Sequence, residues 1–378
     1  MYQRTLTPSI QDRFFSGKVI MLLGAGQIGK TTLIQEILGN SYAPEDVISF
    51  SGDDVGHQIT LGENSLKNLQ PYLDNKKIIF IDEAQKIPNI WNTLKILVEH
   101  YKTTKQIIVT GSSSINLLDQ TSEPLTGRKW VYYLFPISVG EIKTTYDVRE
   151  VYYTLESSLI FWSYPAVLNE KSREEKILLL NDLSNSSLYR DVLEFQQVKS
   201  SQIILKLLKL LALQIGKEVA MHELATNLGI DKNTVERYID LLEKSFIIFR
   251  LPPYFTNKRK ELNKANKIYF YDVGIRNAII GNYNTLSNRN DVGELRENFL
   301  TIERMKKLSY AGRYGHHYFW RNYNQAEIDL IEDVDGQLHS FEFKRGEKKV
   351  SVPVAFRKLY PEATFEVINK ENFLEFVM

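Results

Sequence analysis

Residues 24–32, with the sequence GAGQIGKTT, have the residue types and spacing of a loop that binds phosphate groups. They satisfy the pattern G-x-x-x-x-G-K-[ST], between the strand-like run KVIMLL and the helical pattern KTTLIQEIL. The glycines allow successive backbone N–H groups to turn toward phosphates at the positive end of a helix. We expect Lys30 to reach the β- and γ-phosphates of ATP and Thr31 to bind Mg²⁺ through its hydroxyl. The residues predicted to bind the nucleotide here are Gly24, Ala25, Gly26, Gln27, Ile28, Gly29, Lys30, Thr31 and Thr32.

A second motif, KKIIFIDEAQ, is an apolar strand that ends in two adjacent carboxylates, Asp82 and Glu83. Asp82 can hold the Mg²⁺ shell, and Glu83 follows where a general base could polarise the attacking water. The pair therefore predicts ATP hydrolysis as well as ATP binding.

The next strand-like run, KQIIVTGSSS, ends in the hydroxyl residues Thr110, Ser112 and Ser113. These would lie beside the γ-phosphate if this strand neighbours the one that ends at Asp82. Further along, Arg128 in EPLTGRKW could sense or stabilise phosphate charge, within the chain or on a neighbouring copy. The alternative for all of these residues is strand-end capping and a surface salt bridge.

The elements that must position these residues alternate between strand and helix as far as about residue 140. Five short runs are the candidate strands: KVIMLL, DVISF, KKIIFID, KQIIVT and WVYYLF. The segment WNTLKILVEHYKTT places Leu94, Leu97, Val98 and Tyr101 on one helical face. This pattern predicts an α/β fold in which residues 1–141 form a P-loop NTPase domain, a parallel sheet covered by helices.

Three further segments follow, each with its own pattern. Residues 142–200 are mostly helical and predict a lid or connector. Residues 201–272 show three helices and then two strand-like pieces, FIIFRLPPY and KIYFYDV, which is the pattern of a winged helix-turn-helix. Residues 273–378 mix a helix around GELRENFLTIERMKKL with four strand-like runs and predict a separate α/β domain.

Composition excludes some classes of function but does not identify the function. The 378 residues include 47 Lys and Arg against 46 Asp and Glu, so any attraction to nucleic acid must come from a local patch. Cysteine is absent, which excludes disulfides, thiolate zinc sites and thiol nucleophiles. No apolar run approaches the roughly 18 residues that a membrane span needs, and no signal peptide is evident. We therefore expect a cytoplasmic protein that makes no use of a membrane.

The motifs together resemble a known family. The phosphate loop, FIDEAQKIP, VTGSSS, LTGR before LFPISVGEI, KIYFYDVGIRNAIIG, ENF, EIDL and FEFKR look like those of prokaryotic AAA-type ATPases. Such proteins carry a C-terminal domain of unknown function, with a winged helix and a PD-(D/E)XK nuclease-like fold. The resemblance covers nearly the whole chain. Family members usually have Pro and Arg where this chain has Ala25 and Gly26, and GYP where it has SYP at residues 163–165, but neither departure removes a ligand.

The resemblance implies a second metal site in the C-terminal domain. Nucleases of the PD-(D/E)XK type hold Mg²⁺ with an Asp on one strand and a Glu two residues before a Lys on the next. Asp329, Glu342 and Lys344 occupy those places, and Glu297 matches a helix Glu that often assists. Residues 342 and 344 share one face of a strand, so both can meet Asp329. The carboxylates would bind metal and activate water, while Lys344 would orient the nucleophile or neutralise developing charge.

Neighbouring acidic residues add candidates and an alternative. Glu327 is a second candidate ligand, whereas we expect Glu332 and Asp333 to belong to the turn around Gly336. An Asp followed by Glu-x-Lys is also common in charged hairpins, so the alternative is a surface salt bridge between strands.

The winged-helix segment could contact DNA. Its third helix would expose Lys232, Asn233, Thr234 and Arg237, and its wing would supply Lys258, Arg259, Lys260, Lys264 and Lys267. Against DNA contact, Glu236 and Asp240 share the exposed helix face, and winged helices also serve as plain connectors between domains.

These sites predict an ATPase whose nucleotide state is coupled to DNA binding and to Mg²⁺-dependent cleavage. The alternative is a nucleotide-dependent switch or scaffold in which an inactive nuclease-like domain binds a partner. A dedicated transcription regulator is disfavoured, because the mixed-charge helix offers little base readout. The oligomeric state stays open, with a homo-oligomer among the possibilities.

Overall fold

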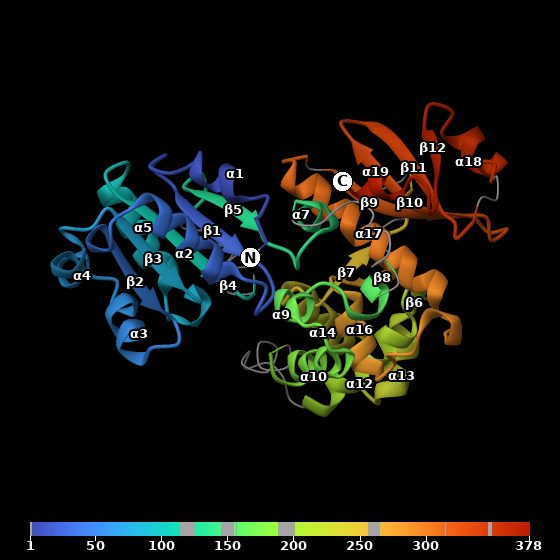
Figure 1. Cartoon of the computed structure of the whole chain (residues 1–378), viewed down its shortest axis with the longest axis horizontal. Helices are drawn as coiled ribbons and strands as arrows, with labels where there is room; N and C mark the ends of the chain where they lie inside the picture. The colour runs from blue at the N-terminus through green and yellow to red at the C-terminus, as the bar shows by residue number, and fades with distance from the viewer. Residues whose placement is uncertain are drawn as a thin grey trace. The chain divides into compact units, whose positions relative to one another are not determined.

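A computed structural model describes residues 2–113, 125–144, 155, 157–187, 201–255, 265–313, 315–346 and 350–378. The chain divides into two compact units. The N-terminal unit comprises residues 4–135 with 244–246, and the C-terminal unit comprises residues 136–243 and 247–378 with the first three residues. The two units are coloured from blue to green and from green to red in Figure 1.

The N-terminal unit is built on a five-stranded sheet in which every pair of neighbours is parallel, as predicted. The strand order is β2-β3-β4-β1-β5. Strand β1 lies between β4 and β5 and is buried along its whole length, which explains its continuous apolar sequence. The strands are β1 (Val19–Leu23), β2 (Val47–Ser51), β3 (Ile78–Asp82), β4 (Gln106–Gly111) and β5 (Lys129–Tyr133).

Helices cover this sheet (Figure 1). Helix α5 buries the predicted stripe of Leu94, Leu97, Val98 and Tyr101. The helices are α1 (Thr7–Gln11), α2 (Lys30–Ser41), α3 (Val55–Gly62), α4 (Leu66–Leu73) and α5 (Ile90–Tyr101), with 3-10 turns η1 (Pro44–Asp46) and η2 (Ala84–Lys86).

The C-terminal unit begins with helices and includes a three-stranded antiparallel sheet of order β6-β8-β7. The Asp231 side chain accepts the N–H of Thr234 at 2.9 Å and so caps the first turn of α14, whose apolar stripe of Val235, Tyr238, Ile239 and Leu242 is buried. The helices are α7 (Val139–Lys143), α9 (Pro165–Asn169), α10 (Arg173–Asp182), α12 (Ser201–Leu213), α13 (Met221–Leu228) and α14 (Lys232–Lys244), with a π-helical turn η3 (Leu183–Ser187). The strands are β6 (Glu218–Val219), β7 (Ile248–Leu251) and β8 (Asn266–Phe270).

A four-stranded sheet of order β12-β11-β10-β9 completes the unit. Strands β9, β10 and β11 are antiparallel, and β12 pairs parallel to β11. These strands are β9 (His316–Arg321), β10 (Glu327–Val334), β11 (Gln337–Phe343) and β12 (Thr364–Ile368). The remaining helices of the unit are α16 (Val273–Ile280), η4 (Leu286–Asn288), α17 (Val292–Tyr310), α18 (Val354–Leu359) and α19 (Phe373–Val377).

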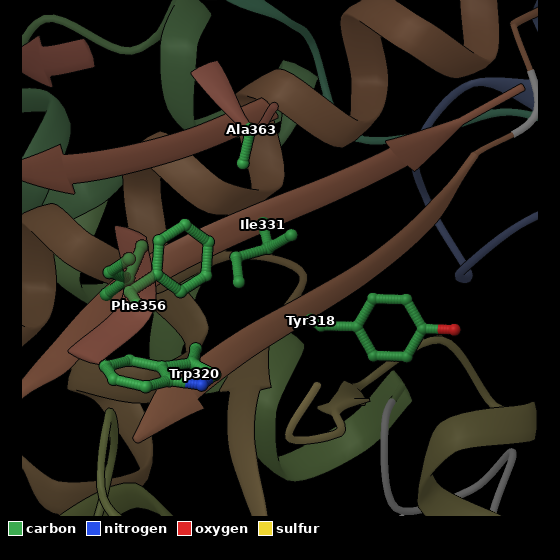
Figure 2. Close-up of a cluster of buried hydrophobic side chains, with 6 residues drawn as sticks. Tyr318, Trp320, Ile331, Phe356 and Ala363 are labelled. Carbon is green, nitrogen blue, oxygen red and sulfur yellow. The ribbon is translucent and has the colours of Figure 1, made fainter. Parts of the chain in front are cut away.

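Buried apolar side chains hold α18 to this sheet. Phe356 of α18 packs edge-on against Trp320 of β9, with 5.2 Å between ring centroids, and Ile331 of β10 belongs to the same cluster (Figure 2). Phe376 of α19 packs against Phe341 of β11 at 4.8 Å. The sheet is therefore fixed by aromatic contacts from α18, which lies between β11 and β12 in sequence, and from α19, which follows β12.

One expectation for this sheet is wrong. We expected Glu332 and Asp333 in the turn around Gly336, but both lie within β10, and Glu332 is only 1% exposed. Arg304 of α17 pairs with Glu332 at 2.8 Å. This ion pair compensates the buried charge of Glu332, and the strand therefore extends through residues whose charges suggested a turn.

No helix among the described residues combines the length and apolar character needed to cross a bilayer.

Candidate functional sites

The predicted phosphate loop connects the end of β1 to the start of α2. Gly24 and Gly29 have φ values of 155° and 93°, which side-chain-bearing residues rarely adopt. A Cβ on Gly24 would also overlap the backbone oxygen of Leu134. The two motif glycines are thus required by the backbone path, independently of any ligand.

Internal contacts hold this loop in shape. The Lys30 ammonium donates to the carbonyl oxygens of Gly24 and Ala25, both at 2.9 Å. Arg4 donates to the carbonyl of Ile28 at 3.0 Å and to that of Phe135 at 2.6 Å. Sequence reasoning missed Arg4, because it precedes β1 and belongs to no motif.

Asp82 lies at the centre of a hydrogen-bonded chain at the carboxyl ends of β3 and β4. The Thr31 hydroxyl lies 3.0 Å from Oδ1 and 2.9 Å from Oδ2 of Asp82, and the Thr110 hydroxyl also donates to Oδ1. Thr110 in turn accepts the backbone N–H of Glu83 at 3.2 Å. The pairing of β3 with β4 brings Thr110 to Asp82, which is the condition that its predicted role required.

Glu83 follows β3 with a left-handed backbone, at a φ of 49°. Its Oε2 accepts a hydrogen bond from Gln85 at 2.5 Å, and Gln85 also donates to the Ser112 hydroxyl at 3.0 Å. Gly52 at the end of β2 has no room for a Cβ beside the Glu83 carbonyl. Gln85 was not predicted as a site residue, although it lies within the quoted motif.

Arg128 forms a surface salt bridge, which was the alternative to its predicted role at the phosphate. Its guanidinium pairs with Glu99 of α5 at 3.0 Å, and both side chains are nearly half exposed. The predicted phosphate-sensing role of Arg128 gains no support from this contact.

The Thr31 hydroxyl and the Asp82 carboxylate are adjacent hard oxygen donors, which fit Mg²⁺.

A second cluster of ionisable groups lies in the C-terminal unit. One carboxylate oxygen each from Glu297 of α17 and from Glu327 and Asp329 of β10 all lie within 4.8 Å of one another. Asp329 also accepts the backbone N–H of Phe343 on β11 at 2.7 Å. We call the group of Glu297, Glu327, Asp329, Glu342 and Lys344 the carboxylate centre.

Glu342 and Lys344 join the centre from the end of β11. The Lys344 ammonium lies 2.6 Å from Glu342 Oε1, while Glu342 Oε2 is buried without a hydrogen-bond partner. The structure thus brings together all four residues predicted for this site, and Glu327 with them. A buried carboxylate oxygen without a hydrogen-bond partner fits a divalent cation, which would supply it with a ligand contact.

Burial shifts the proton affinities of this centre. Burial raises the pKa of Glu297 to about 7, with the charge of Lys267 opposing the shift. Burial, followed by the charge of Glu342, raises the pKa of Asp329 to about 6. Neighbouring buried carboxylates disfavour one another's ionisation, and a bound cation would make the ionised forms favourable.

Lys267 of β8 corrects one prediction. We expected it to reach DNA from an exposed wing, but it is only 2% exposed, and its ammonium lies 2.7 Å from Glu297 Oε1 and also pairs with Glu327. Burial lowers the pKa of Lys267, but the two carboxylates outweigh burial and raise the pKa above its usual value. The other predicted wing cations, Lys258, Arg259, Lys260 and Lys264, lie outside the described residues.

On helix α14 the predicted DNA-facing charges are partly paired. Lys232 lies 3.2 Å from Glu236, and Arg250 of β7 pairs with Asp240 at 2.7 Å. Both acidic residues that argued against DNA contact are thus neutralised within the protein.

Family models match three parts of the chain. Residues 16–143 match a model described as an AAA domain. Residues 153–286 and 292–374 match two models that are each described as a domain of unknown function, DUF8612 and DUF4143. With its phosphate loop and parallel sheet, the N-terminal unit resembles a P-loop AAA fold, which confirms the prediction of a parallel sheet covered by helices.

Particular proteins are similar over most of the chain. The uncharacterized protein Rv2008c of Mycobacterium tuberculosis is 28% identical over 329 residues, which cover 86% of this chain and 70% of Rv2008c. An uncharacterized protein of Haemophilus influenzae is 22% identical over 379 residues, which cover 93% of this chain and 86% of that protein.

Among solved structures, the replication initiator DnaA bound to AMPPCP and single-stranded DNA is 18% identical with a TM-score of 0.32, covering 63% of this chain and 86% of that chain. AMPPCP-bound DnaA from Aquifex aeolicus is 18% identical with a TM-score of 0.28, covering 68% of this chain and 88% of that chain.

Proposed function

We propose that the N-terminal unit binds ATP and hydrolyses it to ADP and phosphate. The observation that carries this proposal is the hydrogen-bonded chain from Thr31 through Asp82 and Thr110 to the backbone of Glu83. It joins the phosphate loop to the adjacent carboxylates, which must act on the same phosphate.

Each residue of this site has a separate task. Lys30 would exchange its carbonyl partners for the β- and γ-phosphates, and Thr31 and Asp82 would hold Mg²⁺. The metal ion, when bound, neutralises charge on the phosphate oxygens. Glu83 accepts a hydrogen bond from the attacking water and polarises it, while Thr110 fixes the position of Asp82 and of the Glu83 backbone.

Substitution of Lys30 tests ATP binding. Lys30→Ala should abolish tight binding of a fluorescent ATP analogue, because the β- and γ-phosphates lose their cation. Lys67→Ala, which removes an exposed lysine of α4, is the matched control and should bind the analogue normally. Unchanged binding by Lys30→Ala would contradict the site assignment.

For the C-terminal unit we propose a nuclease-like domain within residues 273–378 that hydrolyses DNA with a divalent cation. Support comes from the cluster of Glu297, Glu327 and Asp329 on α17 and β10, and from Glu342 and Lys344 at the end of the neighbouring strand β11. The carboxylates would hold the cation, which activates water, and Lys344 would orient the nucleophile or neutralise charge on the phosphate.

Residues 201–272 are proposed to form a winged helix that links the ATPase to this domain. The sequence α12-α13-α14 followed by β7 and β8 supports the motif. Because charges on α14 are partly paired with other side chains, we favour a connector that assists non-specific DNA binding over a reader of bases.

A second candidate function is a nucleotide-dependent switch or scaffold. One observation favours it, since Lys267 pairs with Glu297 and Glu327, two of the carboxylates that would hold the cation. In this case the nuclease-like domain would bind a partner without cleaving DNA.

DNA integrity separates the two candidates. Single- and double-stranded DNA is incubated with Mg²⁺ or Mn²⁺, with and without ATP, using wild type, Lys344→Ala and the exposed-lysine control Lys358→Ala. Cleavage lost only in Lys344→Ala, with ATPase activity kept, supports the nuclease. No cleavage by wild type under any condition supports the switch.

We further propose that ATP and DNA binding are coupled. Coupled sites must influence one another reciprocally, so DNA should change ATP affinity by the factor by which ATP changes DNA affinity. The absence of any such change would refute the coupling.

A further inference from the structure

Gln85 lies in the 3-10 turn η2, just after β3, and is only 8% exposed. Its side-chain amide nitrogen lies 2.5 Å from Oε2 of Glu83 and 3.0 Å from the hydroxyl of Ser112, the first residue after β4. An ionised carboxylate only accepts hydrogen bonds, so the amide must present its NH₂ group to Glu83. Gln85 therefore bridges the proposed general base and the neighbouring strand.

The local backbone path brings this amide to Glu83. The N–H of Lys86 donates to the Glu83 carbonyl at 3.0 Å and closes the turn that carries Gln85. On the other side, the N–H of Gly52 donates to the Asp82 carbonyl at 2.8 Å, and a Cβ on Gly52 would overlap the Glu83 carbonyl oxygen. The backbone of Glu83 is thus fixed by its neighbours, and the amide of Gln85 restrains its side chain.

The two carboxylate oxygens of Glu83 are in different situations. Oε2 accepts from Gln85, whereas Oε1 accepts no hydrogen bond from any residue that the structure describes. The amide therefore fixes the rotation of the carboxylate and leaves one oxygen open. A general base needs both properties, because it must face the water and have an oxygen available to accept its proton.

The end of β4 holds the two adjacent carboxylates through two hydroxyl residues. Thr110 donates to Asp82 and accepts the backbone N–H of Glu83 at 3.2 Å. Ser112, two residues later, anchors the Glu83 side chain through Gln85. One strand end therefore sets the position of the proposed metal ligand, of the backbone of the base and of its carboxylate.

We propose that Gln85 is a positioning residue for ATP hydrolysis, which orients the Glu83 carboxylate toward the attacking water. The inference rests on the proposed ATPase function of the N-terminal unit. Gln85 acts through Glu83 and need not touch the nucleotide. Without the amide the carboxylate can rotate, and a displacement of about 1 Å in a catalytic group can slow a reaction by about 100-fold.

Gln85→Met tests this role, because methionine is unbranched like glutamine but donates no hydrogen bond. We expect kcat for ATP hydrolysis to fall about tenfold, with the affinity for ATP within about twofold of wild type. Phosphate release and equilibrium binding of a fluorescent ATP analogue measure the two quantities. Gln70→Met, which changes an exposed glutamine of α4, is the matched control and should alter neither. If Gln85→Met does not fold, Gln85→Ala makes the same test.

A second background distinguishes positioning from packing. If Gln85 acts through Glu83, adding Gln85→Met to Glu83→Gln should slow hydrolysis no further, since the base is already lost. Single-turnover hydrolysis measures the low rates of these two proteins. A packing role would instead weaken ATP binding and slow hydrolysis in both backgrounds.

The outcomes also separate this inference from the ATPase proposal. A lower kcat for Gln85→Met that disappears in the Glu83→Gln background upholds the inference. An unchanged or raised kcat for Gln85→Met, or an equal loss in both backgrounds, overturns it while the ATPase proposal stands. No hydrolysis by wild type, or a wild-type rate for Glu83→Gln, overturns both.

Discussion

The ammonium of Lys267 lies 2.7 Å from Oε1 of Glu297, although the lysine belongs to a three-stranded sheet and the glutamate to helix α17. Lys267 also pairs with Glu327 of β10. One buried cation therefore ties the proposed wing to two carboxylates of the nuclease-like centre.

Lys267→Met should lower the free energy of unfolding, because it removes the cation that pairs with two buried carboxylates of this centre. Removing one partner of a buried ion pair leaves uncompensated charge, and we expect a loss of about 3 kcal/mol in the free energy of unfolding at pH 8. The loss should be smaller at pH 6, because Glu297, with a pKa of about 7, can then take up a proton. Urea unfolding at both pH values measures this.

Mn²⁺ tests whether the same carboxylates bind a divalent cation. If the carboxylates bind a divalent cation, Mn²⁺ should raise the melting temperature of Lys267→Met more than that of wild type, since the competing ammonium is gone. Lys217→Met, which removes an exposed lysine before β6, is the control and should respond as wild type does. An identical Mn²⁺ response in all three proteins would argue against a cation site.

Glu83→Gln should separate ATP binding from hydrolysis. The amide keeps the size of the side chain but cannot polarise water as a base, so hydrolysis should fall by about 100-fold or more. ATP affinity should stay within a few-fold, because the phosphate loop is untouched. Phosphate release and equilibrium binding of ATP measure the two effects, with the exposed Glu63→Gln as control. Near-normal hydrolysis would remove Glu83 from the mechanism.

Thr110 offers a sharper test of the hydrogen-bonded chain. Thr110→Val has nearly the same shape but loses the donation to Asp82 and the acceptance from the Glu83 backbone. We expect kcat for ATP hydrolysis to fall about tenfold, and Thr110→Ser, which keeps the hydroxyl, to restore most of it. Should Val and Ser variants hydrolyse ATP equally, Thr110 would be only a packing residue.

The nucleotide site was predictable because its signals are local. In the phosphate loop motif, a strand, a glycine-containing loop and a helix occupy consecutive residues. The apolar run that ends in Asp82 can likewise be recognised as a strand without knowledge of its neighbours. Thr110 needed one further fact, namely that β4 neighbours β3. Arg4 and Gln85 could not be assigned, since their partners are set by how the loop folds and not by spacing.

The carboxylate centre shows the limit of sequence reasoning more clearly. Strand alternation placed Glu342 and Lys344 together, but Lys267 was assigned to DNA because cations in a predicted wing are usually exposed. Its true partner, Glu297, is 30 residues away and on another element. Glu332 was assigned to a turn for the same reason, because a charge on a strand looks exposed until its buried partner is known.

Asp272 makes the stability of the C-terminal unit depend on pH. It caps α16 by accepting the N–H of Ile275 at 3.0 Å, and it also accepts the backbone N–H of Ser163. Burial raises its pKa from 3.8 to about 7, against the opposing effect of these hydrogen bonds and of Lys306. The folded protein therefore holds a proton on Asp272 over a pH range in which the unfolded chain has released it.

It follows that the contribution of Asp272 is fully present below pH 4 and is lost as pH rises toward 7. Asp272→Asn keeps a capping oxygen and cannot ionise, so wild type should lose about 2 kcal/mol of unfolding free energy relative to this variant between pH 5 and pH 7. Urea unfolding of both proteins at pH 5, 6 and 7 measures the difference. A constant difference would mean that Asp272 is already ionised in the folded protein at pH 5, and that the hydrogen bonds from Ile275 and Ser163 outweigh its burial.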